Sequence, residues 1–261
     1  RPLPRRREGG IGTVMSDALL LYHVSDVHFG YEDRAALDWF AAEVARERPA
    51  LVICTGDLTM RGSAREFALA QDWLAALPAP LVLTPGNHDV PYYHHLLRRL
   101  TRPYARYRAL ESALGHQTGH DAIAVVPLKT IARAQLRLNW SKGRVSAGDL
   151  DTALQGLAHQ AGKPLRLVAG HHPLVDADTE SSGSTRGGKS ALAALARAGA
   201  QAVLSGHVHD PFDMTLELDG QPIRLIGAGT LSQRLRSSAP SFNRLVWSAE
   251  QGLTVEARRF S

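Results

Sequence analysis

The feature that most constrains this chain is a series of short apolar runs, each followed within a few residues by aspartate, asparagine or histidine, with glycine beside most of them. Short apolar runs bounded by turn residues are typical of buried strands. Five runs carry such polar residues at their carboxyl ends: Leu19–Val24, Leu51–Cys54, Leu81–Leu83, Leu165–Ala169 and Ala202–Leu204. Because parallel strands present their carboxyl ends at one edge of a sheet, we expect these polar side chains to lie close together.

Helical patterns separate the strand-like runs. Apolar residues three or four positions apart predict helices that include Leu37, Phe67, Leu154 and Leu192, and Ser63 with Glu66 has the form of a capping box. From Met214 onward no helical pattern occurs, and four short runs with an Asp219-Gly220 turn predict a series of antiparallel strands. Strands that alternate with helices and then continue as strands predict an α/β fold.

Composition excludes several classes of protein. A chain of 261 residues with 44% hydrophobic residues can bury a large core, and its single cysteine, Cys54, excludes a disulfide scaffold or a four-cysteine zinc site. No run approaches the ~18 apolar residues of a membrane span. The net charge of +5 includes +3 from the first 14 residues, so the remainder is close to balanced and a nucleic-acid partner is not expected. No apolar signal segment follows the arginines, so we expect a cytoplasmic protein.

The polar residues at the strand ends form an ordered set of motifs. They are Asp26-Val27-His28, Gly56-Asp57, Gly86-Asn87-His88-Asp89, Gly170-His171-His172-Pro173 and Gly206-His207-Val208-His209. Any one of these motifs is common by chance, but five in order, each after an apolar run, are specific. This set resembles the calcineurin-like metallophosphoesterase superfamily, from about Leu19 to the end of the chain.

The resemblance implies a fold and a domain organisation. The expected α/β fold is a four-layer α-β-β-α sandwich of two mixed sheets flanked by helices, with a dinuclear metal site at the strand ends. Residues 1–15 are expected to be a basic tail or extension, and residues 16–261 a single metallophosphoesterase domain.

The resemblance also implies a set of metal ligands. Asp57 is expected to bridge two ions, which a carboxylate can do with its two oxygens. Histidine nitrogen with carboxylate and amide oxygen suits two divalent or mixed-valence ions of manganese, iron, zinc or cobalt. The first ion would be held by Asp26, His28, Asp57 and His209, and the second by Asp57, Asn87, His171 and His207.

Three further residues receive roles from the same resemblance. His88 matches the histidine that protonates or stabilises the leaving oxygen without binding metal, and Asp89 would orient it. In the family the ligand is the histidine two positions before the proline, which is His171 here. His172 would then face the substrate or support the ligands.

The implied reaction is hydrolysis of a phosphodiester by attack of a metal-activated hydroxide. Within the superfamily the chain looks like the bacterial class III cyclic nucleotide phosphodiesterases, so a 3′,5′-cyclic nucleotide such as cyclic AMP is the expected substrate. One alternative is a UDP-2,3-diacylglucosamine-type pyrophosphohydrolase, although those enzymes commonly carry arginine at the position of His88. The other is a non-catalytic scaffold on the same fold. The expected partners are a small phosphoester and, as one option, a second copy of the chain.

Two segments each allow two interpretations. The stretch from Tyr92 to Leu114 is amphipathic and rich in arginine, which predicts either a solvated helix face or a cap that selects an anionic substrate. The glycine- and serine-rich stretch 181–188 predicts either an ordinary surface loop or a lid over the site.

Overall fold

The computed structural model describes residues 18–91, 95–115, 119–132, 141–179 and 185–261. The expected basic tail (residues 1–15) and residues 181–184 of the expected lid therefore lie outside the described residues. In the described chain no helix is long and apolar enough to cross a bilayer.

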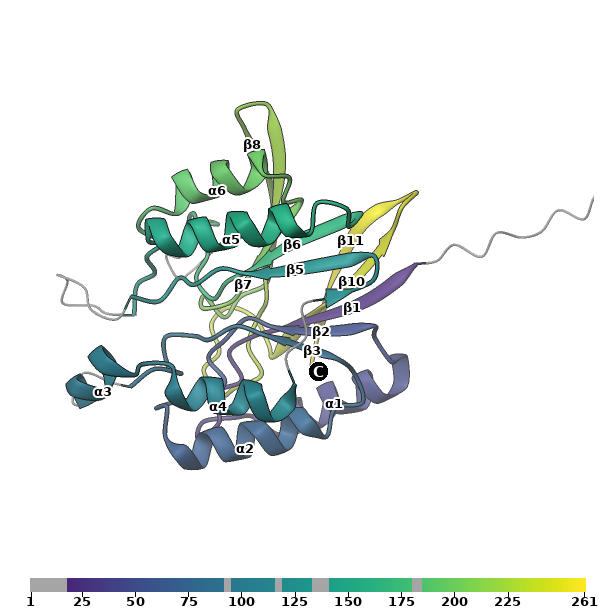
Figure 1. Ribbon diagram of the computed structural model, residues 1–261. Helices are drawn as coiled ribbons and strands as arrows, with labels where there is room; N and C mark the ends of the chain where they lie inside the picture. Colours follow the sequence, from purple (N-terminus) through teal and green to yellow (C-terminus); the bar gives the residue numbers. More distant parts are fainter. Residues whose placement is uncertain (1–17, 92–94, 116–118, 133–140, 180–184) are drawn as a thin grey trace, which may run out of the picture.

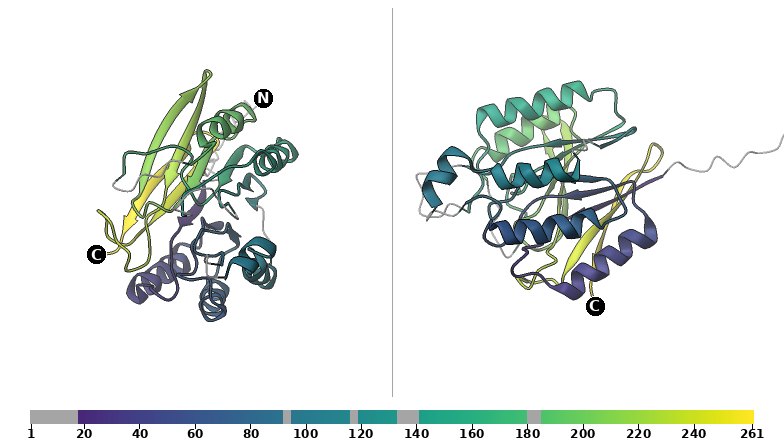
Figure 2. Two further views of the ribbon diagram at one scale, coloured as in Figure 1. Left: turned by 90° about the vertical axis from the view of Figure 1, so that its left-hand side faces the viewer. Right: turned by 60° about the horizontal axis from the view of Figure 1, so that its bottom comes forward.

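Two mixed sheets pack face to face and helices cover both outer sides, so the expected four-layer α-β-β-α sandwich is confirmed (Figure 1). The view onto the edge where the parallel strands end shows the helices at the two outer sides (Figure 2, left). The described helices are α1 (Arg34–Glu47), α2 (Ala64–Ala75), α3 (Leu96–Thr101), α4 (Ala105–Leu114), α5 (Ala147–His159) and α6 (Gly188–Arg197).

The first sheet has five strands in the order β11-β10-β1-β2-β3. Strands β1, β2 and β3 are parallel, while β10 pairs antiparallel with both β1 and β11. Their bounds are β1 (Leu19–Val24), β2 (Leu51–Cys54), β3 (Leu81–Leu83), β10 (Ser241–Ser248) and β11 (Gly252–Arg259).

The second sheet has six strands in the order β4-β5-β6-β7-β9-β8. Strands β5, β6, β7 and β9 run parallel, with β4 and β8 antiparallel at the two edges. Their bounds are β4 (Gly119–His120), β5 (Ile123–Pro127), β6 (Leu165–Ala169), β7 (Ala202–Ser205), β8 (Phe212–Leu218) and β9 (Gln221–Gly227).

Successive side chains of the central strands point to opposite faces of the sheet and so form separate apolar layers. On β1, Leu21 belongs to the apolar cluster between the sheets, whereas its neighbour Tyr22 belongs to the cluster under the helices of the first sheet. Tyr22 packs there against Phe40 and Phe242, with ring centroids 6.0 Å and 4.7 Å away. Both faces of these strands are buried, which explains why they are continuously apolar in the sequence. The two sheets are thereby held together along their length, and their strand ends meet at one edge.

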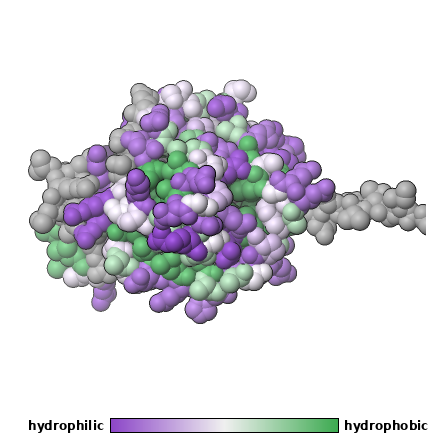
Figure 3. All heavy atoms as spheres, turned by 90° about the horizontal axis from the view of Figure 1, so that it is seen from above, coloured by the Kyte–Doolittle hydropathy of each residue, from purple (hydrophilic) through white to green (hydrophobic). Residues whose placement is uncertain are grey.

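The helix boundaries follow the expected capping chemistry. The Ser63 hydroxyl accepts from the Glu66 amide, and the Glu66 carboxylate accepts from the Ser63 amide, so the capping box is confirmed. On the other side of the molecule, α6 buries Leu192 and Leu195 against the second sheet. The outer face over α5 and α6 presents mostly hydrophilic residues with hydrophobic patches between them (Figure 3).

The last strands differ from the expected antiparallel series. Asp219 and Gly220 form the expected hairpin turn, with φ of 53° and 72°, between β8 and β9. However, β9 pairs parallel with β7 in the second sheet, while the next strand, β10, joins the first sheet beside β1. The antiparallel pairs β8–β9 and β10–β11 are confirmed, but they lie in different sheets and do not form one series, because periodicity identifies strands and not their partners.

The arginine-rich segment is two helices rather than one. Helix α3 ends at Thr101 and α4 begins at Ala105, with Pro103 between them. A proline lacks the amide hydrogen needed inside a helix and disfavours helical conformation in the residue before it. Arg99 of α3 is 5% exposed, so it does not belong to a solvated face.

Candidate metal centre

The predicted site residues lie in the loops that follow five parallel strands. Asp26 and His28 follow β1, Asp57 follows β2, and Asn87 and His88 follow β3 in the first sheet. From the second sheet, loops after β6 and β7 supply His171, His207 and His209. Backbone hydrogen bonds tie the loops together: the Asp26 amide donates to Gly56 and the Gly206 amide donates to His171. The two sheets thus contribute to one cluster.

Five of these residues have left-handed backbone conformations. Asp26, His28, Asp57, His207 and His209 have φ between 51° and 71°. A residue with a side chain rarely adopts this conformation, which costs on the order of 1–3 kcal/mol per residue and persists where the surrounding structure enforces it. Such strain concentrated at the ends of buried strands is characteristic of a functional site.

Glycines allow the loops to approach one another. A β-carbon at Gly86 would collide with the backbone and carboxylate of Asp57, and one at Gly206 would collide with Ser25 and Asp26. The absence of a side chain at these two positions therefore brings the loops after β2 and β3, and those after β1 and β7, into contact.

Asp26, His28 and His209 form one buried group. The Nε2 atom of His209 lies 3.1 Å from Asp26 Oδ1 and 3.3 Å from His28 Nε2. Ligands held about 2.1 Å from a single ion lie roughly 3.0–3.4 Å from each other, so these distances suit a shared metal. Asp26 Oδ1 is buried and has no hydrogen-bond partner among the described residues. A buried carboxylate oxygen without a donor fits the presence of a cation.

Asp57, Asn87 and His171 form a second group. His171 Nε2 lies 3.1 Å from Asn87 Oδ1 and 3.3 Å from Asp57 Oδ2. The ring of His207 lies beside them, with its centroid 5.2 Å from that of His171. Asp57 Oδ2 is also 3.8 Å from Nε2 of His28 in the first group. The carboxylate of Asp57 therefore lies between the two groups.

Three of the histidines have their second ring nitrogen held by backbone. Nδ1 donates to a carbonyl oxygen in each: His28 to Thr59, His171 to Thr55, and His209 to Arg234. A carbonyl can only accept, so in the neutral ring the lone pair is at Nε2, which faces the cluster. This is the arrangement that orients metal-binding histidines in other proteins. The donor set of imidazole nitrogen with carboxylate and amide oxygen suits borderline transition metals.

The charges of the cluster depend on one another. Burial alone would raise the pKa of Asp57, but the neighbouring His171 and His88 outweigh it and hold that pKa well below its usual range. Burial opposes the charged form of His171, yet the Asp57 carboxylate raises the pKa of this histidine to about 9. Burial and the nearby His171 lower the pKa of His207 to about 3. The Asp57 carboxylate is therefore anionic, which is the state that binds a metal ion.

His88 and Asp89 lie beside the cluster but make different contacts. His88 Nδ1 donates to the Met60 carbonyl at 2.7 Å, and the His88 backbone amide donates to Asp57 Oδ1 at 2.7 Å. The Asp89 carboxylate instead accepts from the amides of Leu58, Thr59 and Gly86 and from the Thr59 hydroxyl. Asp89 thus contacts the backbone on either side of the two loops, and its expected role in orienting His88 stays a prediction.

The buried carboxylate of Asp89 resists ionisation more than an exposed one. Burial and the charge of Asp57 raise the pKa of Asp89 to about 6, against the hydrogen bonds from Gly86 and Thr59. Both of its oxygens accept hydrogen bonds, so Asp89 joins the loop after β2 to the loop after β3.

His172 differs from His171 in its hydrogen bonds. Its Nε2 donates to the Ser141 carbonyl at 2.7 Å, and its Nδ1 lies 2.8 Å from the Thr130 hydroxyl. Its ring lies against that of His207, with centroids 4.4 Å apart. With both nitrogens engaged, His172 is placed to orient His207, and the substrate contact expected from the sequence stays a prediction.

Sequence reasoning missed Arg234, which lies in the loop between β9 and β10. Its Nη1 atom is 3.2 Å from Nε2 of His88 and 3.4 Å from Nε2 of His28. Its carbonyl accepts from His209, which fixes the loop against the cluster. Arg234 belongs to no motif, and a single arginine in a polar loop carries no signal that distinguishes it from its neighbours Arg236 and Arg244.

The fold and the buried clusters define a class, the metal-dependent phosphoesterases with a two-metal site. A sequence profile of the calcineurin-like phosphoesterases matches residues 19–211. The chain therefore belongs to the calcineurin-like phosphoesterase family, and the resemblance found in the motifs is confirmed.

The chain is similar in sequence to two phosphodiesterases. A probable cyclic nucleotide phosphodiesterase of Synechococcus is 24% identical over 206 residues, 74% of each chain. A glycerophosphodiester phosphodiesterase of Enterobacter lignolyticus is 34% identical over 82 residues, which span 27% of this chain and only 30% of that enzyme.

The structural similarity covers nearly the whole chain. A dimetal phosphatase from Danio rerio superposes with a TM-score of 0.62 at 13% identity, over 93% of this chain and 99% of that one. A purple acid phosphatase from yellow lupin gives 0.66 at 12% identity, over 94% of this chain and 52% of that one. At this identity the similarity shows the fold alone.

The role of Asp89 as a link between loops can be tested by stability. Asp89→Asn places an NH₂ group against backbone amides that donate to the carboxylate, so at least one donor loses its acceptor. We expect a loss of about 1–3 kcal/mol in the free energy of unfolding, measured by chemical denaturation. Asp72→Asn on the exposed side of α2 is the matched control. Equal stability of the two variants would contradict the role of Asp89.

Proposed function

We propose that the chain hydrolyses a phosphodiester and that a 3′,5′-cyclic nucleotide such as cyclic AMP is its substrate. Both relatives described above are named as phosphodiesterases, one for cyclic nucleotides and one for glycerophosphodiesters. The observation that carries the proposal is the carboxylate of Asp57, which lies between two groups of inward-facing ligand atoms and also accepts the amide of His88.

The proposed ligands follow from this geometry. Asp26, His28 and His209 would hold one ion, with Asp57 shared. Asn87, His171 and His207 would hold the other. Manganese, iron, zinc and cobalt all suit these donors. Because ligands from both sheets meet at one site, we also propose that residues 16–261 form a single domain.

Bound at these residues, two ions would supply Lewis-acid charge to the phosphoryl group and lower the pKa of a water molecule. The chain's own groups do the rest. Arg234 Nη1 lies within hydrogen-bond distance of Nε2 of both His28 and His88, so its guanidinium is placed where it can bind a phosphoryl oxygen beside them. His88 is fixed through Nδ1 by Met60, and its Nε2 faces this guanidinium. When a phosphoryl oxygen accepts from Arg234 instead, Nε2 can hold a proton for the leaving oxygen.

The substrate proposal is tested with one assay panel on manganese-loaded protein. The panel compares cyclic AMP, an aryl phosphodiester, an aryl phosphomonoester and UDP-2,3-diacylglucosamine. We expect the highest kcat/KM for cyclic AMP and a clear preference for the aryl diester over the monoester. Hydrolysis of UDP-2,3-diacylglucosamine alone would replace the proposal with a pyrophosphohydrolase. No turnover of any compound, with both ions bound, would indicate a scaffold.

Removing the shared carboxylate should empty the centre. Asp57→Ala deletes a ligand of both proposed ions, so we expect the variant to retain less than one ion per chain in elemental analysis and to lose most activity. Asp151→Ala, an exposed carboxylate on α5, is the control and should retain two ions. Two ions in a folded Asp57→Ala variant would contradict the bridging role.

His88 should affect the reaction more than the metal content. A high-pKa alkoxide needs a proton to leave, whereas a nitrophenolate does not. His88→Ala should therefore keep both ions and lose about 10²–10⁴-fold in kcat on cyclic AMP, with a much smaller loss on a nitrophenyl diester. His159→Ala, at an exposed residue of α5, is the control. Equal losses on both substrates would show that His88 stabilises phosphoryl charge instead.

Arg234 should act on the phosphoryl group. Arg234→Ala removes a guanidinium aimed at the site, and we expect kcat/KM for cyclic AMP to fall about 10²-fold with both ions retained. Arg236→Ala, an exposed arginine of the same loop, should change kcat/KM less than threefold. If the two variants behave alike, Arg234 has no direct role in the reaction.

A further inference from the structure

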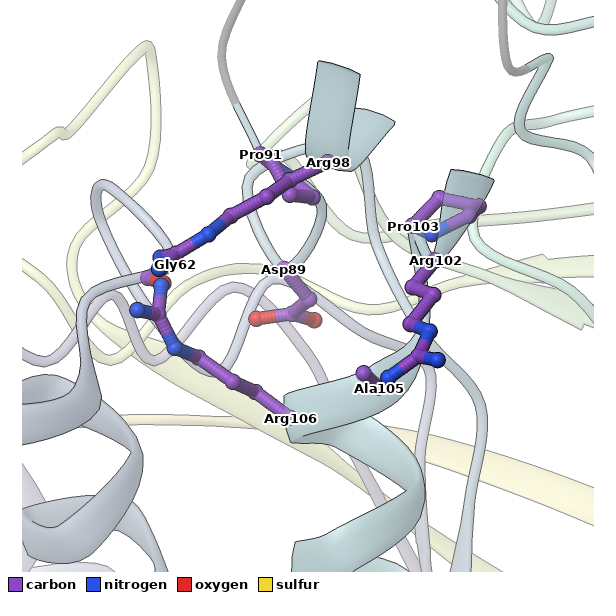
Figure 4. A pocket seen from close by; sticks show the side chains of 8 residues that line it. All are labelled: Gly62, Asp89, Pro91, Arg98, Arg102, Pro103, Ala105 and Arg106. Carbon is purple, nitrogen blue, oxygen red and sulfur yellow. The ribbon is translucent and has the colours of Figure 1, made fainter. Parts of the chain in front are cut away.

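A pocket lined by arginine lies next to the site. It has a volume of about 250 Å³ and is bounded by Gly62, Asp89 and the segment that joins α3 to α4. Arg98 and Arg106 extend toward Gly62 from the two helices, Arg102 lies opposite them, and Asp89 lies between (Figure 4). None of the proposed metal ligands lines this pocket.

The backbone that carries these arginines is held in place by buried contacts. Arg99 donates to the carbonyls of Pro91 and Ala132, and the Tyr104 hydroxyl donates to Ile131 at 3.1 Å. Arg106 is itself fixed, because its guanidinium donates to the Gly62 carbonyl at 2.6 Å. The walls of the pocket therefore have a defined position relative to the loop that carries His88.

Three arginines and one carboxylate line the pocket, so its net charge is positive. The Arg102 amide donates to the Arg98 carbonyl, but the guanidinium groups of these two arginines form no hydrogen bond or ion pair with any residue in the described part of the chain. The carboxylate that lines the pocket, Asp89, already accepts from three backbone amides and the Thr59 hydroxyl. Three guanidinium groups around one carboxylate leave an excess of positive charge, which attracts a further anion.

A single helix face does not explain this arrangement. Arg98, Arg102 and Arg108 are all exposed, but Arg108 on α4 does not line the pocket. Arg98 and Arg102 instead meet Arg106 across the break at Pro103, where the chain turns between α3 and α4. The turn, and not helical periodicity, brings the three side chains together.

We propose that this pocket binds a small phosphoryl dianion. Guanidinium groups donate two parallel hydrogen bonds to phosphate oxygens, and several of them can surround one phosphoryl group. The volume is below the ~300–1,000 Å³ typical of sites for drug-sized ligands, so the pocket suits a phosphate group rather than a whole nucleotide. The group can come from free orthophosphate or from a terminal phosphoryl group of a substrate. The proposal does not depend on phosphodiester hydrolysis.

Calorimetric titration of the metal-loaded protein with orthophosphate tests the proposal. We expect the double variant Arg98→Ala/Arg102→Ala to lose one binding event, or to bind at that site at least about tenfold more weakly, since each guanidinium contributes charged hydrogen bonds. Arg108→Ala should bind phosphate as the unmodified protein does. Unchanged phosphate binding by the double variant would overturn the proposal.

Two further measurements separate loss of the pocket from loss of the fold or of the metal centre. The double variant should hydrolyse an aryl diester without charged substituents as fast as the unmodified protein does. Its melting temperature should also be unchanged. The variant Arg98→Lys/Arg102→Lys keeps the charge without the paired donors. Its phosphate affinity should therefore lie between that of the unmodified protein and that of the alanine double variant. A lysine variant as weak as the alanine variant, with a lowered melting temperature in both, would show that the arginines serve folding and would overturn the proposal.

Measurements of KM show whether the bound phosphoryl group is free phosphate or part of the substrate. We would compare two diesters that differ only by a terminal phosphoryl group. If the phosphorylated diester has the lower KM, and the double variant loses this preference, the pocket binds part of the substrate. If phosphate binds but KM is equal for both diesters, the pocket binds free phosphate. Either result supports the site.

Discussion

The structure depends on a small group of buried carboxylates surrounded by histidines where two sheets meet. The pKa of Asp57 is held low by His171 and His88, although Asp57 is only 2% exposed and burial favours its neutral form. A buried charge of this kind is costly unless it is paired and hydrogen-bonded. Asp57 meets both requirements, because it accepts the His88 amide and faces histidines from both sheets. The loops around it are arranged to supply these partners.

That arrangement requires strained backbone and close contacts in the loops that carry the cluster. Left-handed conformations are adopted by Asp26, His28, Asp57, His207 and His209. At Gly86 and Gly206 the neighbouring loops come so close that any side chain would collide with them. Buried strands on both sides, with apolar clusters between and outside the sheets, hold the ends of the loops in place. The packed core therefore offsets the strain of the loops and holds the proposed ligand atoms in position.

The part of this account that could be predicted from the sequence is the part that depends on local pattern. The bounds of β1, β2, β3 and β6 match their apolar runs, and the order of polar residues after them identified the family. Pairing of β9 with β7 could not be predicted, because partner choice depends on the whole sheet. Arg234 was missed for a similar reason, since a loop outside every motif brings it to the site. The arginine-rich stretch was recognised in the sequence, but the convergence of three of its arginines at the proline break was not.

The central claim is that Asp57 joins two metal ions held by residues of both sheets. An anomalous-difference map from crystals of the manganese-loaded protein tests it most directly. The account predicts two peaks about 3.5–4 Å apart. One should lie against Asp26, His28 and His209, the other against Asn87, His171 and His207, with the Asp57 carboxylate between them. A single peak, or two peaks of which only one contacts Asp57, would contradict it.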